Sequence, residues 1–154
     1  MHLLFICTGN TCRSPLAEAI ARRLVAERRI ADVSVSSAGT SAWPDAPASD
    51  GSLLVALEHG MNLGEHRART LSPELVAGAD LLLAMGPHHL ERAEALGGAG
   101  RAHLLSAFAS GQARAISDPF GGDLDVYRST YRELEQEIGR VLDRIVAERA
   151  PRDA

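Results

Sequence analysis

The 154-residue sequence contains no lysine, and all 16 of its basic side chains are arginine. Its 20 acidic residues give a formal net charge of −4. Because proteins that bind the nucleic-acid backbone need a basic face, this balance argues against a nucleic-acid partner. No apolar run approaches the ~20 residues needed to span a bilayer, and the apolar residues before Cys7 are too few for a signal peptide. We therefore expect a cytoplasmic protein without a membrane partner.

Cysteine is scarce: only Cys7 and Cys12 occur. A structural zinc site needs four ligands, usually in paired clusters, and the neighbours His88 and His89 would point to different sides of a helix. A structural disulfide across so short a loop would add little stability and suits the cytosol poorly. We therefore expect no metal ion and no other cofactor.

Short apolar runs alternate with helical patterns along the chain. Strands are predicted at 2–7, 32–37, 80–85 and 102–105, and helices at 15–29, 49–59, 73–78, 87–96 and 124–149. Ser14–Pro15 and Ser72–Pro73 match the N-cap followed by proline that is typical of helix starts. Because the predicted strands are apolar throughout, the pattern indicates an α/β fold, a parallel sheet with helices on both faces. No repeat or boundary signal divides residues 1–154, so we expect a single domain.

The stretch CTGNTCRSP, residues 7–15, follows the first predicted strand and enters the first predicted helix. Ligands of open α/β sheets bind beyond the carboxyl ends of the strands, where this loop lies. Gly9 permits a positive φ and Asn10 tolerates one, so successive N–H groups can turn inward around an anion. Arg13 adds a planar fork for two phosphate oxygens. The same features would stabilise a thiolate at Cys7, which makes it a candidate nucleophile aimed at phosphorus.

Displacement at phosphorus also needs a proton donor for the leaving group. Asp118 in SDPFGG, residues 117–122, is the candidate, because the following proline holds it in a turn where its carboxylate can project into a cleft. An Asp-Pro pair alone is commonly just a turn. Its combination with the Cys7 to Arg13 loop makes catalysis the preferred interpretation.

The loop and the downstream DPF resemble the low-molecular-weight protein tyrosine phosphatases and the closely related bacterial protein arginine phosphatases. The likeness extends over essentially the whole chain, with SAG at 37–39, DLLLAM at 80–85, DPFGG at 118–122 and LDVYR at 124–128 in matching order. It implies a flavodoxin-like sheet in the order 2-1-3-4 with the phosphate-binding loop after strand 1. It also implies a metal-independent, two-step mechanism acting on phosphorylated proteins.

The resemblance assigns roles to individual residues. Cys7 would attack phosphorus, Arg13 would hold the phosphoryl oxygens, and Asp118 would first protonate the leaving group and then activate water. Ser14 would hydrogen-bond the thiolate, while Asn10, Ser37 and His66 would fix the loop backbone. The whole phosphate-binding loop would comprise Thr8, Gly9, Asn10, Thr11, Cys12, Arg13 and Ser14. Phosphate and other oxyanions would inhibit by occupying this loop.

Three positions bear on the substrate. Thr11 matches the arginine phosphatases, because tyrosine-directed members usually have an aliphatic residue there to pack on the phenyl ring. Phe120 followed by two glycines points the same way. Trp43 lies where tyrosine phosphatases place an aromatic pocket wall, although it could also stack on a guanidinium or plug its loop onto the core. We favour phosphoarginine, with phosphotyrosine as the alternative.

Other functions are compatible with parts of the pattern. An arsenate reductase of this type needs further resolving cysteines, and none follows Cys12. A sugar-transport phosphocarrier would need neither Arg13 nor Asp118, and a non-catalytic phosphoprotein-binding module would be expected to lack Cys7 or Asp118. Since Cys12 lies near Cys7 around the loop, we also expect a reversible Cys7–Cys12 disulfide under peroxide; the alternative is that Cys12 merely packs beneath the loop.

Overall fold

A computed structural model describes residues 1–149 of the chain. The strands are β1 (His2–Cys7), β2 (Ser34–Gly39), β3 (Leu81–Ala84) and β4 (Ala102–Leu104). The helices are α1 (Arg13–Glu27), α2 (Asp50–Glu58), α3 (Pro73–Ala77), α4 (Pro87–Ala93), the π-helical turn η1 (Glu94–Gly98), α5 (Leu105–Ser110) and α6 (Leu124–Arg149). All strand pairs are parallel and the sheet order is β2-β1-β3-β4, which confirms the predicted order 2-1-3-4.

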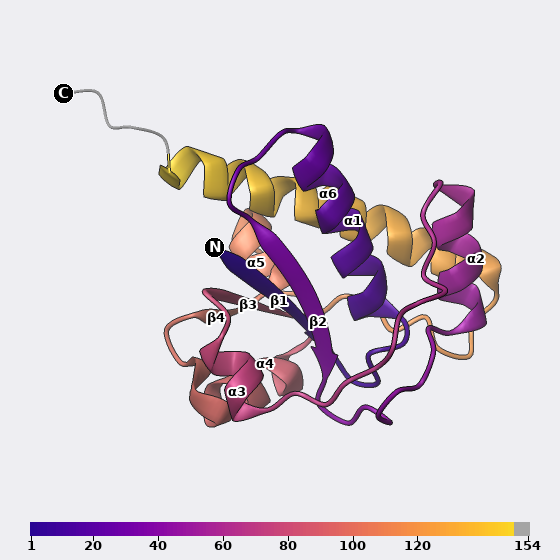
Figure 1. Cartoon of the computed structure of the whole chain (residues 1–154), viewed down its shortest axis with the longest axis horizontal. Coiled ribbons are helices and arrows are strands. Elements are labelled where there is room, and N and C mark those ends of the chain that lie inside the picture. The colour runs from indigo at the N-terminus through magenta and orange to yellow at the C-terminus, as the bar shows by residue number, and fades with distance from the viewer. Residues whose placement is uncertain (150–154) are drawn as a thin grey trace.

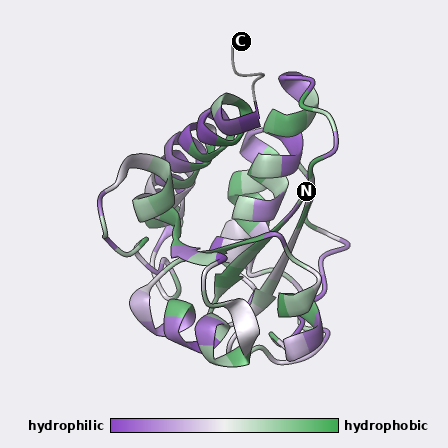
Figure 2. Ribbon diagram, turned by 90° about the vertical axis from the view of Figure 1, so that its left-hand side faces the viewer, coloured by the Kyte–Doolittle hydropathy of each residue, from purple (hydrophilic) through white to green (hydrophobic). Residues whose placement is uncertain are grey.

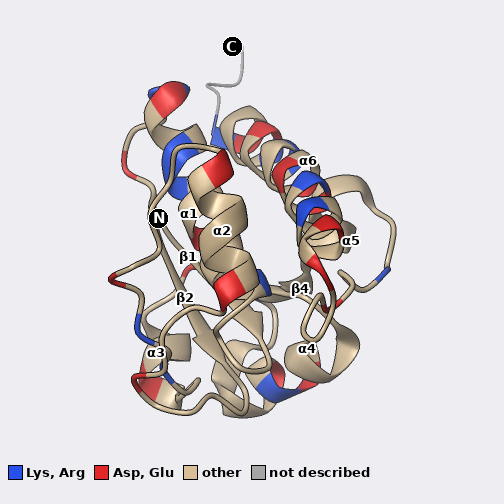
Figure 3. Cartoon of the chain, turned by 90° about the vertical axis from the view of Figure 1, so that its right-hand side faces the viewer, with Lys and Arg blue, Asp and Glu red and all other residues tan. Residues whose placement is uncertain are grey.

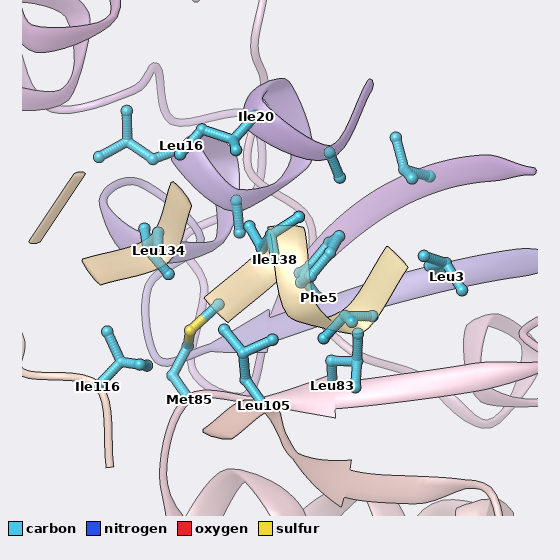
Figure 4. Close-up of a cluster of buried hydrophobic side chains, with 14 of the residues drawn as sticks. Leu3, Phe5, Leu16, Ile20, Leu83, Met85, Leu105, Ile116, Leu134 and Ile138 are labelled. Carbon is cyan, nitrogen blue, oxygen red and sulfur yellow. The ribbon is translucent and has the colours of Figure 1, made fainter. Parts of the chain in front are cut away.

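Alternate residues of the central strands face two separate apolar clusters. Leu3 and Phe5 of β1 belong to the cluster under α1, α5 and α6, whereas Leu4 and Ile6 belong to the cluster under α3 and α4. Figure 1 shows these two helical layers on opposite faces of the sheet, and Figure 2 shows the hydrophobic strands between them. Figure 4 shows how Phe5 lies among side chains from α1, β3 and α6. The prediction of helices on both faces is confirmed.

The predicted bounds differ from the observed ones where the chain turns. Arg29 and Asp32 both take positive φ, so α1 ends at Glu27 and β2 starts only at Ser34. At its other end α1 begins at Arg13, and its N-cap position is Cys12, without a side-chain cap. The prediction that Ser14 caps the first helix is therefore wrong. The prediction for Ser72 is confirmed, because Ser72 caps α3 by accepting a hydrogen bond from the Leu75 N–H. Helix α5 was not predicted, because six residues give too short a periodic signal and, unlike α3, it has no capping side chain at its start.

Arginines join the two long helices on one face of the sheet. Arg23 of α1 lies 2.5 Å from the Glu135 carboxylate of α6, and Arg28 lies 2.9 Å from that of Asp143. Figure 3 shows acidic and basic residues alternating along α6. Within residues 1–149, no helix is both long and apolar enough to cross a membrane.

Candidate active site

The loop of residues 8–12 leaves the carboxyl end of β1 and turns sharply into α1. Within it Asn10 takes the left-handed conformation, with φ 55°, whereas Gly9 keeps a negative φ although it was expected to help make the turn. The loop lies directly against Gly39 at the end of β2. A Cβ atom on Gly39 would lie 2.4 Å from the Thr8 carbonyl oxygen and 2.9 Å from the Asn10 nitrogen. Only glycine allows so close an approach.

Asn10 is completely buried, and its contacts fix which end of its amide faces which partner. Its Oδ1 accepts a hydrogen bond from the Arg69 backbone N–H at 3.0 Å. The amide nitrogen Nδ2 therefore donates, over 2.8 Å to Ser14 Oγ and over 2.9 Å to Ser37 Oγ.

The two serine hydroxyls must then pass their own hydrogens to other groups. Ser37 donates to the Glu18 carboxylate at 2.8 Å. Ser14 lies 2.9 Å from Cys7 Sγ, and because Asn10 donates to its oxygen, the sulfur is the one described partner that can accept its hydrogen. Cys7 and Ser14 are both buried. A hydroxyl donor held in this way favours negative charge on the sulfur.

His66 and Arg69 hold the same loop from outside. His66 Nε2 lies 2.6 Å from the Asn10 carbonyl oxygen, and since a carbonyl only accepts, Nε2 carries the hydrogen. Arg69 Nε donates to the Ser37 carbonyl oxygen at 2.9 Å. The structure thus brings together Asn10, Ser37 and His66, the three residues to which the resemblance assigned the loop backbone, and adds Arg69.

Arg13, which is 6% exposed, joins the loop to the segment that carries Asp118. Its guanidinium donates to the Ile116 carbonyl oxygen at 2.9 Å and lies 3.5 Å from the Asp118 carboxylate. The Ile116 N–H donates in turn to the Met85 carbonyl oxygen, beside the end of β3. The other Asp118 carboxylate oxygen accepts from the Phe120 N–H at 3.1 Å. The half-exposed Asp118 side chain is thereby held at the mouth of the loop.

A cavity of about 220 Å³ lies between these elements. Its lining contains the three residues predicted to be catalytic and most of the predicted phosphate-binding loop: Cys7, Thr8, Gly9, Thr11, Cys12, Arg13, Asp118 and Phe120. Asn10 and Ser14 lie behind this lining and support it through their side chains. The cavity is thus a small hollow with a sulfur, a guanidinium and a carboxylate on its walls.

The three predicted specificity residues are not equivalent. Thr11 and Phe120 line the cavity, and Phe120 is 76% exposed at its rim. Trp43 is 81% exposed and is not among the lining residues. Its loop nevertheless runs beside the phosphate loop, because the Ser41 N–H donates to the Thr8 carbonyl oxygen.

Cys12 is a free thiol, as is Cys7. Its sulfur lies 3.2 Å from Ser49 Oγ and 3.5 Å from the Tyr127 hydroxyl. Burial raises the pKa of Tyr127, and the Cys12 contact acts in the same direction, so this phenol stays protonated at neutral pH. These partners hold Cys12 at one wall of the cavity.

Other hollows of the described chain lack a cysteine, and one of about 260 Å³ next to the loop-supporting His66 is lined by Glu18, Arg22, Asn62, Leu63, Glu65 and His66. No group of three or more His, Cys, Asp or Glu side chains that could hold a metal ion occurs in residues 1–149. A larger hollow of about 380 Å³ lies near the C-terminal ends of α1 and α6. The described residues that line it include Arg28, Arg29 and Arg149 but no cysteine, histidine or carboxylate.

Sequence reasoning missed several residues that support the site. Glu18 carried a signal, because it lies one helical turn after Ser14 on the first helix. Arg69 and His89 come from distant segments and gave none, whereas Tyr127 stands in the LDVYR stretch of the resemblance, which gave it no role. His89 is completely buried, and its Nε2 lies 2.8 Å from the Thr8 hydroxyl.

The family model of low-molecular-weight phosphotyrosine protein phosphatases matches residues 2–150. This chain belongs to that family. A protein-arginine-phosphatase of Bacillus subtilis is 36% identical over 97% of this chain and 99% of its own. A low-molecular-weight protein-tyrosine-phosphatase, PtpB of Staphylococcus haemolyticus, is 37% identical over 92% and 97%.

Solved members of the family share the fold over nearly the full length. A YwlE arginine phosphatase, studied as a C7S mutant with a phosphorylated active-site serine, superimposes with a TM-score of 0.89 at 35% identity and covers 97% of both chains. The YwlE arginine phosphatase of Geobacillus stearothermophilus gives a TM-score of 0.84 at 34% identity over 99% of each chain.

Proposed function

We propose that this member of the low-molecular-weight phosphatase family is a cysteine-dependent protein phosphatase whose preferred substrate is phosphoarginine in proteins. The observation that carries the proposal is the convergence of the Cys7 sulfur, the Arg13 guanidinium and the Asp118 carboxylate on one small cavity. The hydroxyl hydrogen of Ser14, directed at the sulfur, supports a thiolate nucleophile.

The first step transfers the phosphoryl group to the protein. The Cys7 thiolate attacks phosphorus, and the bond from phosphorus to the leaving nitrogen or oxygen breaks. Asp118, at the mouth of the cavity, supplies the proton that neutralises the leaving group. Arg13 and the inward N–H groups of the loop hold the non-bridging oxygens as charge builds on them.

The second step returns the thiolate. The Asp118 carboxylate takes a proton from water, the water oxygen attacks the cysteinyl-phosphate, and the sulfur–phosphorus bond breaks. The Ser14 hydroxyl stabilises the departing sulfur anion. Inorganic phosphate leaves, and no metal or cofactor takes part. Phosphate and other oxyanions are expected to compete for the same cavity.

The preference for phosphoarginine rests on Thr11, which lines the cavity. A hydroxyl suits a polar, planar guanidinium, whereas an aromatic ring gains more from an aliphatic wall. The similarity to arginine phosphatases at 36% and 38% identity supports this choice. Phosphotyrosine is the second candidate, because a tyrosine phosphatase is equally similar at 37%.

The test is a comparison of kcat/KM on matched phosphoarginine and phosphotyrosine peptides, with a chromogenic aryl phosphate as the common reference, all in the presence of a chelator. We expect turnover of the aryl phosphate without added metal and a higher kcat/KM on the phosphoarginine peptide. Absence of turnover on all three substrates would refute the proposed phosphatase activity. A higher kcat/KM on the phosphotyrosine peptide would refute only the proposed preference for phosphoarginine.

A further inference from the structure

His89 of α4 is a buried imidazole with one polar partner in the described structure. Its side chain is completely buried, and Nε2 lies 2.8 Å from Thr8 Oγ1. Nδ1 has no hydrogen-bond partner within the described residues. Thr8 is the residue after Cys7 and lines the same cavity. A buried polar ring is costly unless it is hydrogen-bonded, and the hydrogen bond with Thr8 is the one that this ring makes among the described residues.

The protonation of His89 follows from its surroundings. Burial lowers its pKa to about 4, with His88 and Arg13 acting in the same direction and Asp118 opposing them. The ring is therefore neutral at pH 7 and carries one hydrogen. A hydrogen on Nδ1 would be a buried donor without an acceptor, which is rarer in proteins than an unfilled acceptor. The hydrogen therefore lies on Nε2, and Nε2 donates to Thr8.

The Thr8 hydroxyl can then give its own hydrogen to something else. Among the described residues it has no hydrogen-bond partner besides His89. Because its oxygen accepts from His89 and the side chain lines the cavity, the hydrogen is left for an oxygen bound there. A hydroxyl locked by a second group needs no reorganisation when charge builds on that oxygen.

We propose that His89 is a positioning residue for the phosphate cradle, holding the Thr8 hydroxyl so that its hydrogen is donated to an oxygen of the bound phosphoryl group. Thr8 touches the substrate, and His89 acts through it. This inference rests on the proposed phosphatase function. It adds a side-chain donor to the backbone N–H groups and the Arg13 guanidinium.

Four variants test the pair. Thr8→Val removes the hydroxyl and keeps the shape, whereas His89→Leu removes the donor that orients it. Each should lower kcat/KM for the aryl phosphate about ten-fold, and weaken inhibition by inorganic phosphate, because a hydrogen bond to a charged group is lost. The kcat/KM of the double variant should not fall below that of the less active single variant, since both changes remove the same interaction. His89→Gln, which keeps an N–H near the position of Nε2, should restore part of the activity.

The matched control is His88→Leu, which removes the exposed imidazole that packs on the His89 ring, with 3.8 Å between ring centroids, but makes no hydrogen bond to Thr8. It should keep wild-type kcat/KM. A purely structural role of His89 predicts a lower Tm, an effect that adds to that of Thr8→Val, and no rescue by glutamine; that outcome overturns the proposal. Unchanged kcat/KM and unchanged phosphate inhibition in Thr8→Val would overturn it as well.

Phosphate binding separates this inference from the proposed function. Calorimetry with inorganic phosphate needs no turnover, so it measures the cradle even if the wild type hydrolyses nothing. A wild type that binds phosphate ten-fold tighter than Thr8→Val and His89→Leu but does not turn over would refute the phosphatase and keep the positioning role. If the wild type turns over and all variants equal it in kcat/KM and in phosphate binding, the phosphatase function stands and the positioning role of His89 is refuted.

Discussion

Gly39→Ala is predicted to disable the site without touching any reacting group. The added Cβ would lie 2.4 Å from the Thr8 carbonyl oxygen, 2.9 Å from the Asn10 nitrogen and 3.0 Å from the Gly9 carbonyl carbon. All three atoms are backbone, so no flexible side chain can move aside.

The size of the effect follows from the required displacement. Ordinary contact at such a Cβ begins near 3.4 Å, so the Thr8 carbonyl must retreat by the difference from 2.4 Å, 3.4 − 2.4 = 1.0 Å. A misplacement of about 1 Å at a catalytic site can cost about 100-fold in rate. The overpacking itself should lower the free energy of unfolding by about 1–3 kcal/mol. Gly39 cannot move away easily, because its N–H and carbonyl are hydrogen-bonded to the Arg69 and Leu71 backbones.

The assay combines kcat/KM on the aryl phosphate, inhibition by inorganic phosphate and the Tm. We expect a kcat/KM about 100-fold below wild type together with weaker phosphate inhibition. Gly78→Ala is the matched control, because its Cβ would meet only ordinary contacts of 3.5 Å and 3.8 Å at the end of α3. Wild-type kcat/KM and phosphate inhibition in Gly39→Ala would show that the cradle does not depend on this close approach.

Four further predictions concern single side chains. Cys7→Ser should abolish turnover while phosphate still binds, and near-normal turnover of any phosphorylated substrate would remove the mechanism. Thr11→Ile should lower kcat/KM on phosphoarginine relative to phosphotyrosine peptides by about ten- to a few-hundred-fold, which is the effect of a few methyl-sized contacts. An unchanged ratio would show that Thr11 does not select the substrate. Peroxide should oxidise Cys7 and Cys12 to a disulfide and is itself reduced to water. Treatment with a thiol should then restore the activity of the wild type more fully than that of Cys12→Ser. Equal recovery of activity in both proteins would count against a Cys7–Cys12 disulfide. The depressed pKa of His89, about 4 against the usual 6.5, means that its contribution to stability is full above pH 6.5 and is lost as the pH falls towards 4, by at most about 3 kcal/mol. His89→Gln should flatten this acid-side loss in urea unfolding measured at several pH values, and an unchanged slope would contradict the assignment.

The fold could be predicted because its signals are local. Because β1 and β3 are buried on both faces, they appear in the sequence as apolar runs. The alternation of such runs with helices then predicts a parallel sheet. The order of the strands came from the resemblance and not from the runs. The start of α1 could not be read from Ser14, because that side chain serves the Cys7 sulfur instead of capping the helix.

The reacting groups of the candidate site were also readable, since Cys7 and Arg13 share one short loop and Asp118 lies in a recognisable turn. The supporting groups could not be read from the residues alone: Asn10, Ser37 and His66 were named only through the resemblance, and Arg69 and His89 were missed. Each comes from a different segment and carries an ordinary residue type. The amide of Asn10 is oriented by a backbone N–H 59 residues away, and Thr8 meets His89 81 residues further along the chain. Such contacts are set by tertiary packing, which no local pattern contains.

This difference matters for how selectivity can arise in the family. Cys7 and Arg13 flank a loop whose backbone is clamped by Gly39 and Asn10, so they have little freedom to vary. Thr11, in contrast, lines the cavity and takes no part in breaking or forming bonds in the proposed mechanism. Changes at Thr11 are therefore expected to alter which phosphorylated group is accepted while the chemistry at Cys7 stays in place.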